Sequence, residues 1–407
     1  MRWLGVLALL LSARAGVAGE RPDLRVASVV LGRRPGEGRM LLAVPGQWLK
    51  PGALWKYQLV YWRGRKLLFQ QRGERAFVSV DGKEPQLASL LVETPADAKA
   101  LEKLLADGAR EFAIVVRAAK GWLPRLPVLP AGRDLALAVL YCYKLDVAAL
   151  AAQTDVESLK IGDLGNYTDL GPLAAMRGLR NLTIYRSRRV KWPTLAKLTQ
   201  LEALALDDCG NNCDLAAVAR LPRLISLRVG AGSGQPRNPQ ALAGMTRLRR
   251  LSMRSWRGLG DLSLVARLTR LEGLEVTQTD VADLSPLAGM TNLRWLSLSY
   301  SARIKDLRPL LKLKRLTSLS LVRCEGVTSL ATLGKMTWLR ELDLSYCDGF
   351  SDLSPLAPLT RLERLDLQHC KGVRNLEPLK HMIRAGTEIE VSRQLQPQLE
   401  ALRKTDF

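Results

Sequence analysis

Leucines recur at a fixed spacing through most of this chain. Nine of them lie 22 to 24 residues apart, and each opens the pattern L-x-x-L-x-L. These opening residues are Leu179, Leu201, Leu224, Leu248, Leu271, Leu293, Leu316, Leu339 and Leu362. The fourth position is leucine in every copy and the sixth is aliphatic or methionine, with weaker copies at 156–161 and within 133–155. A register held over so many copies indicates a repeat protein.

The spacing within each copy predicts a short strand. Positions four and six are two residues apart, so their side chains point to the same face, and positions three, five and seven point to the other. A single strand cannot bury its leucines alone, whereas stacked strands form a parallel sheet with a continuous core. We therefore predict an α/β solenoid with a concave parallel β-sheet and short connections on its convex side.

The second half of the repeat carries turn signals. The sequence DLSPLA begins at Asp283 and again at Asp352, and DLRPL begins at Asp306. Serine followed by proline is typical of a helix cap followed by the first helical position, so Ser285 and Ser354 are expected caps. The segment is too short for more than a turn or two, which predicts 3₁₀ or brief α turns.

The L-x-x-L-x-L strands and DLSPLA turns resemble the leucine-rich-repeat superfamily, specifically the 22- to 23-residue repeats of bacterial internalins. The resemblance covers about residues 132–392 and implies a horseshoe-shaped binding protein. It does not imply a particular ligand, because this fold carries many unrelated partners.

The ninth position departs from the internalin pattern. Internalin-type repeats carry asparagine there, whereas this chain has Cys209, Cys324, Cys347 and Cys370 in four of its repeats. A thiol is a small apolar group with a weak donor, so we expect these cysteines to be buried and free. Cys209 and Cys213 share one loop and are the best candidates for a disulfide.

The ends of the chain lack the repeat. Residues 1–18 combine a basic start, a short apolar run and small residues, which predicts a signal peptide, with no cysteine near the cleavage site for a lipid anchor. We expect a secreted or periplasmic protein without a membrane span. Residues 19–85 alternate at 24–31, 39–44, 54–62, 66–71 and 76–80, which predicts a small all-β domain.

Caps are predicted on both sides of the repeats at 132–392. Residues 86–131 are expected to cap the N-terminal side, with an amphipathic helix at 95–107 and a strand at 112–116. Residues 393–407 are expected to cap the other side, with a helix at 396–404 that follows a last strand at 388–391. Such caps cover the apolar ends of the stack.

Charge narrows the class of partner. The formal net charge is +22 and the isoelectric point is about 10.1, which favours anionic partners. Arginines are spread along the chain and not gathered in one tail, which argues against nucleic acid. No metalloprotease, phosphate-loop or nucleophile-elbow motif is present, and the cysteines lack metal-ligand spacing. We therefore expect no enzymatic activity, cofactor, metal ion or small-molecule substrate.

Two features of the predicted concave face stand out. Its charge is polarised, with arginines on the middle repeats and carboxylates toward the last ones. In addition, the eighth position reads Tyr300, Arg323, Tyr346 and His369, which stacking would place in one column, and an arginine between two tyrosines makes cation–π contacts. The same column could instead serve only to stiffen the array.

These features favour a protein partner on the concave face. The predicted binding residues are Trp295, Tyr300, Arg323, Glu341, Asp343, Tyr346, Arg364, Asp366, Arg228, Arg250 and Arg254. The alternative is an anionic envelope or extracellular polymer held by the arginine-rich surface, with Arg186, Arg188, Arg189 and Lys191 in one loop. Steep salt dependence distinguishes the polymer from a tyrosine- and tryptophan-anchored interface.

Overall fold

The computed structural model describes residues 147–404, apart from 163, 165–167, 188, 210–212, 231, 233–234 and 257. Before residue 147 it describes only the strands β1 to β8. The chain divides into two units, one with the strands β1 to β11 and one with the helix α3 and the strands β12 to β19. The predicted signal segment and the helix predicted at 95–107 lie outside the described residues.

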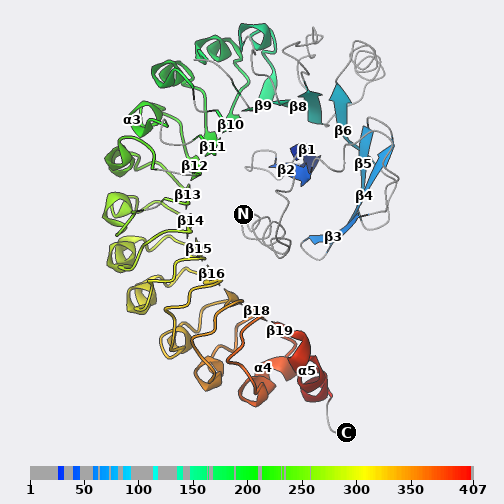
Figure 1. The fold of residues 1–407 in the computed structure, drawn as a ribbon, viewed down its shortest axis with the longest axis vertical. Coiled ribbons are helices and arrows are strands. Elements are labelled where there is room, and N and C mark those ends of the chain that lie inside the picture. Colours follow the sequence, from blue (N-terminus) through cyan, green and yellow to red (C-terminus); the bar gives the residue numbers. More distant parts are fainter. Residues whose placement is uncertain are drawn as a thin grey trace, which may run out of the picture. The chain divides into compact units, whose positions relative to one another are not determined.

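Each repeat contributes one strand to a parallel sheet, as Figure 1 shows. In the first unit these strands are β8 (Leu135–Leu140), β9 (Val156–Gly162), β10 (Asn181–Tyr185) and β11 (Ala203–Asp207). In the second they are β12 (Ser226–Gly230), β13 (Arg250–Arg254), β14 (Gly273–Thr277), β15 (Trp295–Ser297), β16 (Ser318–Ser320), β17 (Glu341–Asp343), β18 (Arg364–Leu367) and β19 (Glu388–Val391). Fourth-position leucines lie opposite one another, as Leu251 and Leu274 do. The predicted leucine-rich-repeat solenoid is confirmed.

The core lies between the strands and the turns. The fourth-position leucines of β10 to β18 are at most 2% exposed, and the residues at position six are equally buried. Full burial of one such side chain contributes roughly 1.5–3 kcal/mol, so the repeated pair accounts for the stability of the stack. The alternation of buried and half-exposed residues in β10, β11 and β12 confirms that positions three, five and seven face away from the core.

Short helices occupy the convex side. The 3₁₀ turns are η3 (Val147–Leu150), η4 (Gly171–Ala175), η5 (Trp192–Lys197), η7 (Pro239–Gly244), η8 (Ser263–Val265), η9 (Ser285–Gly289), η10 (Arg308–Lys312), η11 (Leu333–Lys335), η12 (Ser354–Leu356), η13 (Glu377–Leu379) and η14 (Arg393–Leu395). The α-helices are α3 (Leu215–Val218), α4 (Lys380–Arg384) and α5 (Gln396–Arg403). The predicted last strand and final helix correspond to β19 and α5.

The expected serine caps are wrong: the cap position holds leucine, Leu284 before η9 and Leu353 before η12, and its side chain makes no capping bond. In η9 and η12 serine is the first helical residue, and proline follows it. The carboxylate of Asp283 accepts a bond from the backbone N–H of Ser285 at 2.8 Å, and Asp352 binds Ser354 at the same distance. These bonds, together with those from the serine hydroxyls, lower the pKa of both aspartates below the ordinary value.

Of the strands before the repeats, β1 to β5 and β7 overlap the predicted β-rich stretches, whereas β6 was not predicted. β1 (Val26–Leu31) and β2 (Met40–Pro45) form an antiparallel pair. β3 (Gln58–Trp62), β4 (Arg65–Arg72), β5 (Arg75–Val80) and β6 (Gln86–Val92) pair antiparallel in chain order. β6, β7 (Ala113–Arg117) and β8 then pair in parallel, with Leu90 opposite Ile114 and Ile114 opposite Leu137. The parallel pairing thus begins before residue 132, where the repeats were predicted to start. That residues 19–85 form a separate β domain stays a prediction.

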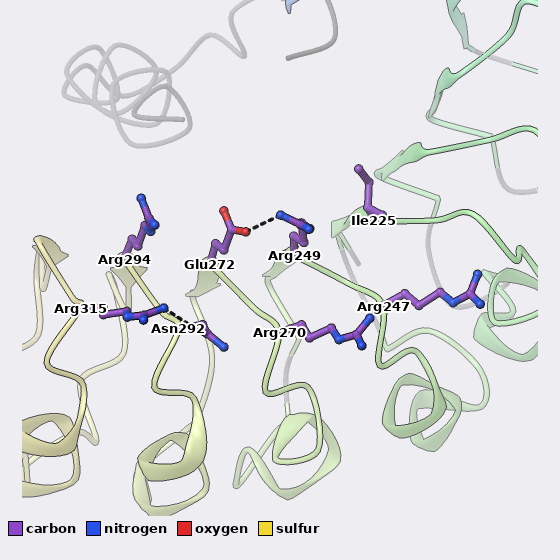
Figure 2. A pocket seen from close by; sticks show the side chains of 8 residues that line it. All are labelled: Ile225, Arg247, Arg249, Arg270, Glu272, Asn292, Arg294 and Arg315. Carbon is purple, nitrogen blue, oxygen red and sulfur yellow. Dashed lines mark hydrogen bonds and ion pairs between the residues drawn. The ribbon is translucent and has the colours of Figure 1, made fainter. Parts of the chain in front are cut away.

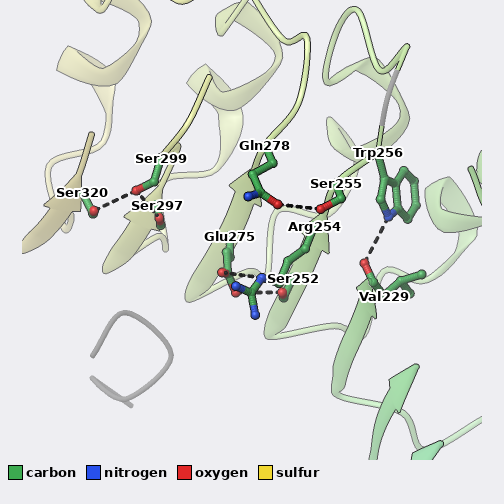
Figure 3. A network of polar contacts seen from close by, with 10 residues as sticks. All are labelled: Val229, Ser252, Arg254, Ser255, Trp256, Glu275, Gln278, Ser297, Ser299 and Ser320. Atoms are coloured by element: carbon green, nitrogen blue, oxygen red, sulfur yellow. Dashed lines mark hydrogen bonds and ion pairs between the residues drawn. The ribbon is translucent and has the colours of Figure 1, made fainter. Parts of the chain in front are cut away.

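A ladder of donors at position nine links neighbouring repeats. The thiols of Cys324, Cys347 and Cys370 donate to the sixth-position carbonyl of the repeat before, at 3.2, 3.1 and 3.1 Å. The indole Nε1 of Trp256 donates to the equivalent carbonyl of Val229 at 3.1 Å (Figure 3). A thiol and an indole therefore make the same bond between neighbouring repeats.

The described cysteines are all free and buried, and the disulfide considered between Cys209 and Cys213 is not formed. Burial raises the pKa of Cys209, Cys324, Cys347 and Cys370 to about 12, because a thiolate in this apolar environment would be poorly solvated. These thiols are structural groups.

In the described part of the chain, no helix has the length and apolar character needed to cross a bilayer.

Candidate functional site

The eighth position of the repeat has an unusual backbone conformation. In every repeat from β10 to β18 in which this residue is described, it follows the strand with φ between 49° and 61°. These residues are Arg186, Asp208, Ser255, Gln278, Tyr300, Arg323, Tyr346 and His369. Left-handed backbone is uncommon for such side chains. It turns the chain at the end of each strand, and within each unit it places these side chains of successive repeats along the same edge of the sheet.

At the C-terminal end this edge carries a stack of rings and a cation. The guanidinium of Arg323 lies 5.9 Å from the ring centroid of Tyr300 and 5.6 Å from that of Tyr346. Tyr346 and His369 stack with centroids 4.3 Å apart. Both tyrosines are half-buried, whereas Arg323 and His369 are exposed. The predicted contacts in the edge column (Tyr300, Arg323, Tyr346 and His369) are therefore present.

Carboxylates crowd the face beside this column. Asp343, Asp366 and Glu390 lie opposite one another on β17, β18 and β19. Burial, followed by the charges of Asp343 and Glu390, raises the pKa of Asp366 to about 7. Burial also raises the pKa of Asp343, although a backbone N–H donates to each aspartate. Arg364 forms an ion pair with Glu390, so this acidic row (Asp343, Asp366 and Glu390) is incompletely neutralised.

The arginines predicted on the middle repeats are less dominant than expected. Arg254 forms an ion pair with Glu275 at 3.4 Å, and the hydroxyl of Ser252 donates to the same carboxylate at 2.7 Å (Figure 3). Arg250 lies opposite Gly273 on the next strand, and Arg228 lies opposite Ser252. The positive charge predicted for β12 and β13 is thus partly balanced by a carboxylate from β14.

Trp295 lies on the same face, next to a glycine. A β-carbon on Gly273 would come within 3.3 Å of Cε3 of Trp295, so the glycine leaves room for the indole. Along this row of the sheet, Ser318 separates Trp295 from Glu341, and Glu341 lies opposite Arg364. The structure thus brings the edge column, the acidic row, Glu341 and Arg364 onto neighbouring strands. Arg228, Arg250 and Arg254 lie on β12 and β13.

One group of residues escaped the sequence analysis altogether. A hollow of about 410 Å³ lies where the strands begin, and its side chains come from the second position of the repeat and from the residue before the repeat (Figure 2). The lining residues are Ile225, Arg247, Arg249, Arg270, Glu272, Asn292, Arg294 and Arg315. The sequence signal that could have predicted this hollow is the recurrence of arginine just before or after the leucine that opens each repeat.

Two kinds of reactive centre were sought among the described residues. Among the described residues, no cluster of three or more histidine, cysteine or acidic side chains is arranged to hold a metal ion. A nucleophilic cysteine needs thiolate character, whereas the ladder thiols have a pKa of about 12.

The register, the strand in each repeat and the convex turns together define a leucine-rich-repeat protein. No protein-family model and no curated protein matches the chain. Solved structures similar to it include an internalin (inlF) from Listeria monocytogenes, with 22% identity, coverage of 64% of this chain and 78% of that one, and a TM-score of 0.48.

Two further solved structures are similar. Internalin C2 from Listeria monocytogenes is 25% identical, with coverage of 49% of this chain and 82% of that one and a TM-score of 0.40. A leucine-rich-repeat protein from Leptospira interrogans is 15% identical, with coverage of 74% and 88% and a TM-score of 0.45.

Proposed function

We propose that this chain is an exported, non-enzymatic binding module that holds a protein partner on the concave face of its C-terminal repeats. The site extends from Trp295 to Asp366 and includes the edge column. The observation that carries the proposal is the contact of Arg323 with the rings of both Tyr300 and Tyr346.

Arginine and tyrosine are the side chains that most often dominate the energetics of protein interfaces. Here three of them already touch in the free chain, so binding would immobilise few new rotamers and would cost less conformational entropy. The left-handed backbone brings these bulky side chains to one edge, at a position where asparagine or glycine would be less strained.

The acidic row supports a partner of defined charge. Asp343, Asp366 and Glu390 lie on adjacent strands, and the pKa of Asp366 is raised first by burial and then by the charges of the other two carboxylates. A lysine or arginine from a partner would stabilise the ionised carboxylates, because a nearby positive charge and a charge-assisted hydrogen bond both favour the ionised form. We therefore infer a partner with an exposed cation close to an apolar or aromatic patch.

The experiment is affinity capture with three baits from the native surroundings. The baits are the unaltered chain, a Y300A/Y346A variant, and an S255A/Q278A variant that changes the eighth position in two other repeats. A protein retained by the first and third baits and lost from the second is then purified and titrated. We expect at least about tenfold weaker binding by Y300A/Y346A, because interface anchors of this kind contribute more than about 1.4 kcal/mol.

Salt dependence provides the second criterion. Binding anchored by aromatic side chains should change little between low and moderate salt, whereas purely ionic contacts are screened. Equal recovery of the same protein by all three baits, or loss of all captured material at moderate salt, would overturn the proposal.

A further inference from the structure

The hollow at the strand starts is a two-row grid of arginines. Figure 2 shows one row with Ile225, Arg249, Glu272 and Arg294, and beside it a second row with Arg247, Arg270, Asn292 and Arg315. Backbone hydrogen bonds hold the first row in register. The N–H of Glu272 donates to the carbonyl oxygen of Arg249 at 2.7 Å, and the N–H of Arg294 donates to the carbonyl oxygen of Glu272 at 2.8 Å. We call this surface the arginine groove.

Positive charge dominates the arginine groove. Its lining includes five arginines and a single carboxylate, that of Glu272. Arg249 pairs with Glu272 at 2.8 Å, and Arg315 donates to the side-chain oxygen of Asn292 at the same distance. Arg270 and Arg294 are exposed, and within the described part of the chain neither forms an ion pair. Two guanidinium groups are therefore available to an anion.

The spacing favours an extended ligand. Neighbouring strands lie about 4.8 Å apart, so the grid repeats at that interval across the sheet. Arg247 and Arg270 are neighbours within their row, so their guanidinium groups repel one another, and a bound anion would relieve this repulsion. Arginine presents a planar fork that takes a carboxylate through two parallel hydrogen bonds. A linear polymer that runs perpendicular to the strands, along the ends where they begin, would therefore contact several guanidinium groups one after another.

The rest of the lining favours a sugar polymer over other polyanions. Glu272 and Asn292 offer oxygens that can accept bonds from hydroxyl groups, which a polysaccharide provides on every sugar and the backbone of DNA lacks. The lining contains no aromatic ring on which a base could stack. Ile225 is its one apolar side chain, which leaves a protein partner without a buried anchor.

We propose that the arginine groove binds a linear polysaccharide that carries carboxylate groups. The groove is a second site, because its residues precede the strands whereas the edge column follows them. The loop at 186–191, chosen from sequence for such a polymer, is a weaker candidate because Arg186 already pairs with Asp208 at 3.6 Å.

The test measures binding of the full chain to four probes: polygalacturonate, its methyl ester, neutral dextran and single-stranded DNA. The groove variant is R270Q/R294Q. The matched control is R267Q/R374Q, which removes the same charge from two exposed arginines outside the lining. We expect binding to polygalacturonate alone, weakened about tenfold or more by the groove variant and less than about twofold by the control.

The salt dependence of polygalacturonate binding should also become shallower in the groove variant, since fewer ionic contacts remain. Thermal unfolding of both variants checks that the fold is intact. The proposal is overturned if polygalacturonate does not bind, if dextran or the methyl ester binds equally, or if both variants lose affinity equally. Tighter binding of single-stranded DNA, lost in the groove variant, would replace the polysaccharide with nucleic acid as the ligand.

Discussion

Tyr346 and His369 stack with their ring centroids 4.3 Å apart and their planes inclined by 19°. Both residues have φ of 61°, so two left-handed residues from successive repeats present their rings to each other. The stack therefore depends on the backbone turn after each strand as much as on the side chains. A substitution that keeps the left-handed turn and removes the ring can therefore test the contribution of the edge column to stability apart from its contribution to binding.

The substitution Tyr346→Asn tests that separation. Asparagine tolerates the left-handed conformation well, which offsets the loss of a stacked pair that contributes about 0.5–1.5 kcal/mol. We expect the free energy of unfolding to change by less than about 1 kcal/mol, while affinity for the captured partner falls about tenfold or more. Urea unfolding and titration measure the two quantities. A large loss of stability with unchanged affinity would assign the column a purely structural role.

Substitution of Asp366 should change how stability depends on pH. The pKa of Asp366 is about 7 in the folded chain, against about 3.9 when unfolded, so the folded state binds more protons between these values. Stability from this group is therefore lost as pH rises from about 4 to about 7. D366N removes this loss and keeps an acceptor for the N–H of Gln368. Because the folded pKa lies about three pKa units above the unfolded one, we expect D366N to gain up to roughly 4 kcal/mol over the unaltered chain at pH 8 relative to pH 4.

Urea unfolding at pH 4 and pH 8 measures the difference, and D352N provides the control. Bonds from Ser354 lower the pKa of Asp352, so its contribution has the opposite sign and is lost as pH falls. If D366N and D352N shift the pH dependence in the same direction, the acidic row does not carry the repulsion described above.

The ladder thiols should be unreactive in the folded chain. Cys324, Cys347 and Cys370 are buried and have a pKa of about 12, so little thiolate exists at pH 8. We expect iodoacetamide to leave their peptides unmodified under native conditions and to alkylate them in concentrated urea. Peptide mass mapping measures this. Rapid native alkylation would show that the repeats open locally at these positions.

A close approach between two convex turns leaves no room for a side chain at Gly334. A β-carbon on Gly334 would collide with the carbonyl oxygen of Pro355 in the next turn, whereas one on Gly289 would meet nothing within 4 Å. We expect G334A to lower the free energy of unfolding by about 1–3 kcal/mol, because the backbone itself must move. G289A should change it by less than about 1 kcal/mol. Equal effects in urea unfolding would show that the turns have room to separate.

The strands were predictable from sequence because their determinant is local and repeated. Two apolar positions per strand set the face and the register, and the structure pairs Leu251 with Leu274 as that pattern requires. The order of the edge column followed from the same register. The predicted serine caps failed because each turn begins one residue earlier than serine followed by proline indicates, and only the backbone geometry shows that the N–H of Ser285 donates to Asp283.

Other features depended on distances across repeats that spacing alone does not give. Glu275 forms an ion pair with Arg254 from the neighbouring strand, and the repeat pattern alone does not show that the two side chains meet. Trp256 replaces a thiol in the ladder because its indole N–H reaches the carbonyl of Val229. The arginine groove was missed because its residues, such as Arg270 and Arg294, flank the opening leucine and lie outside positions three, five and seven.

The parallel register also constrains how a chain of this kind can evolve. Duplication of one repeat within the run from β12 to β19 would lengthen the sheet by about 4.8 Å and leave every leucine in a buried position. The residues before the strand would extend the arginine groove, and the residue after it would extend the edge column. Gain or loss of repeats could therefore adjust the reach of both surfaces while the chemistry of each is kept.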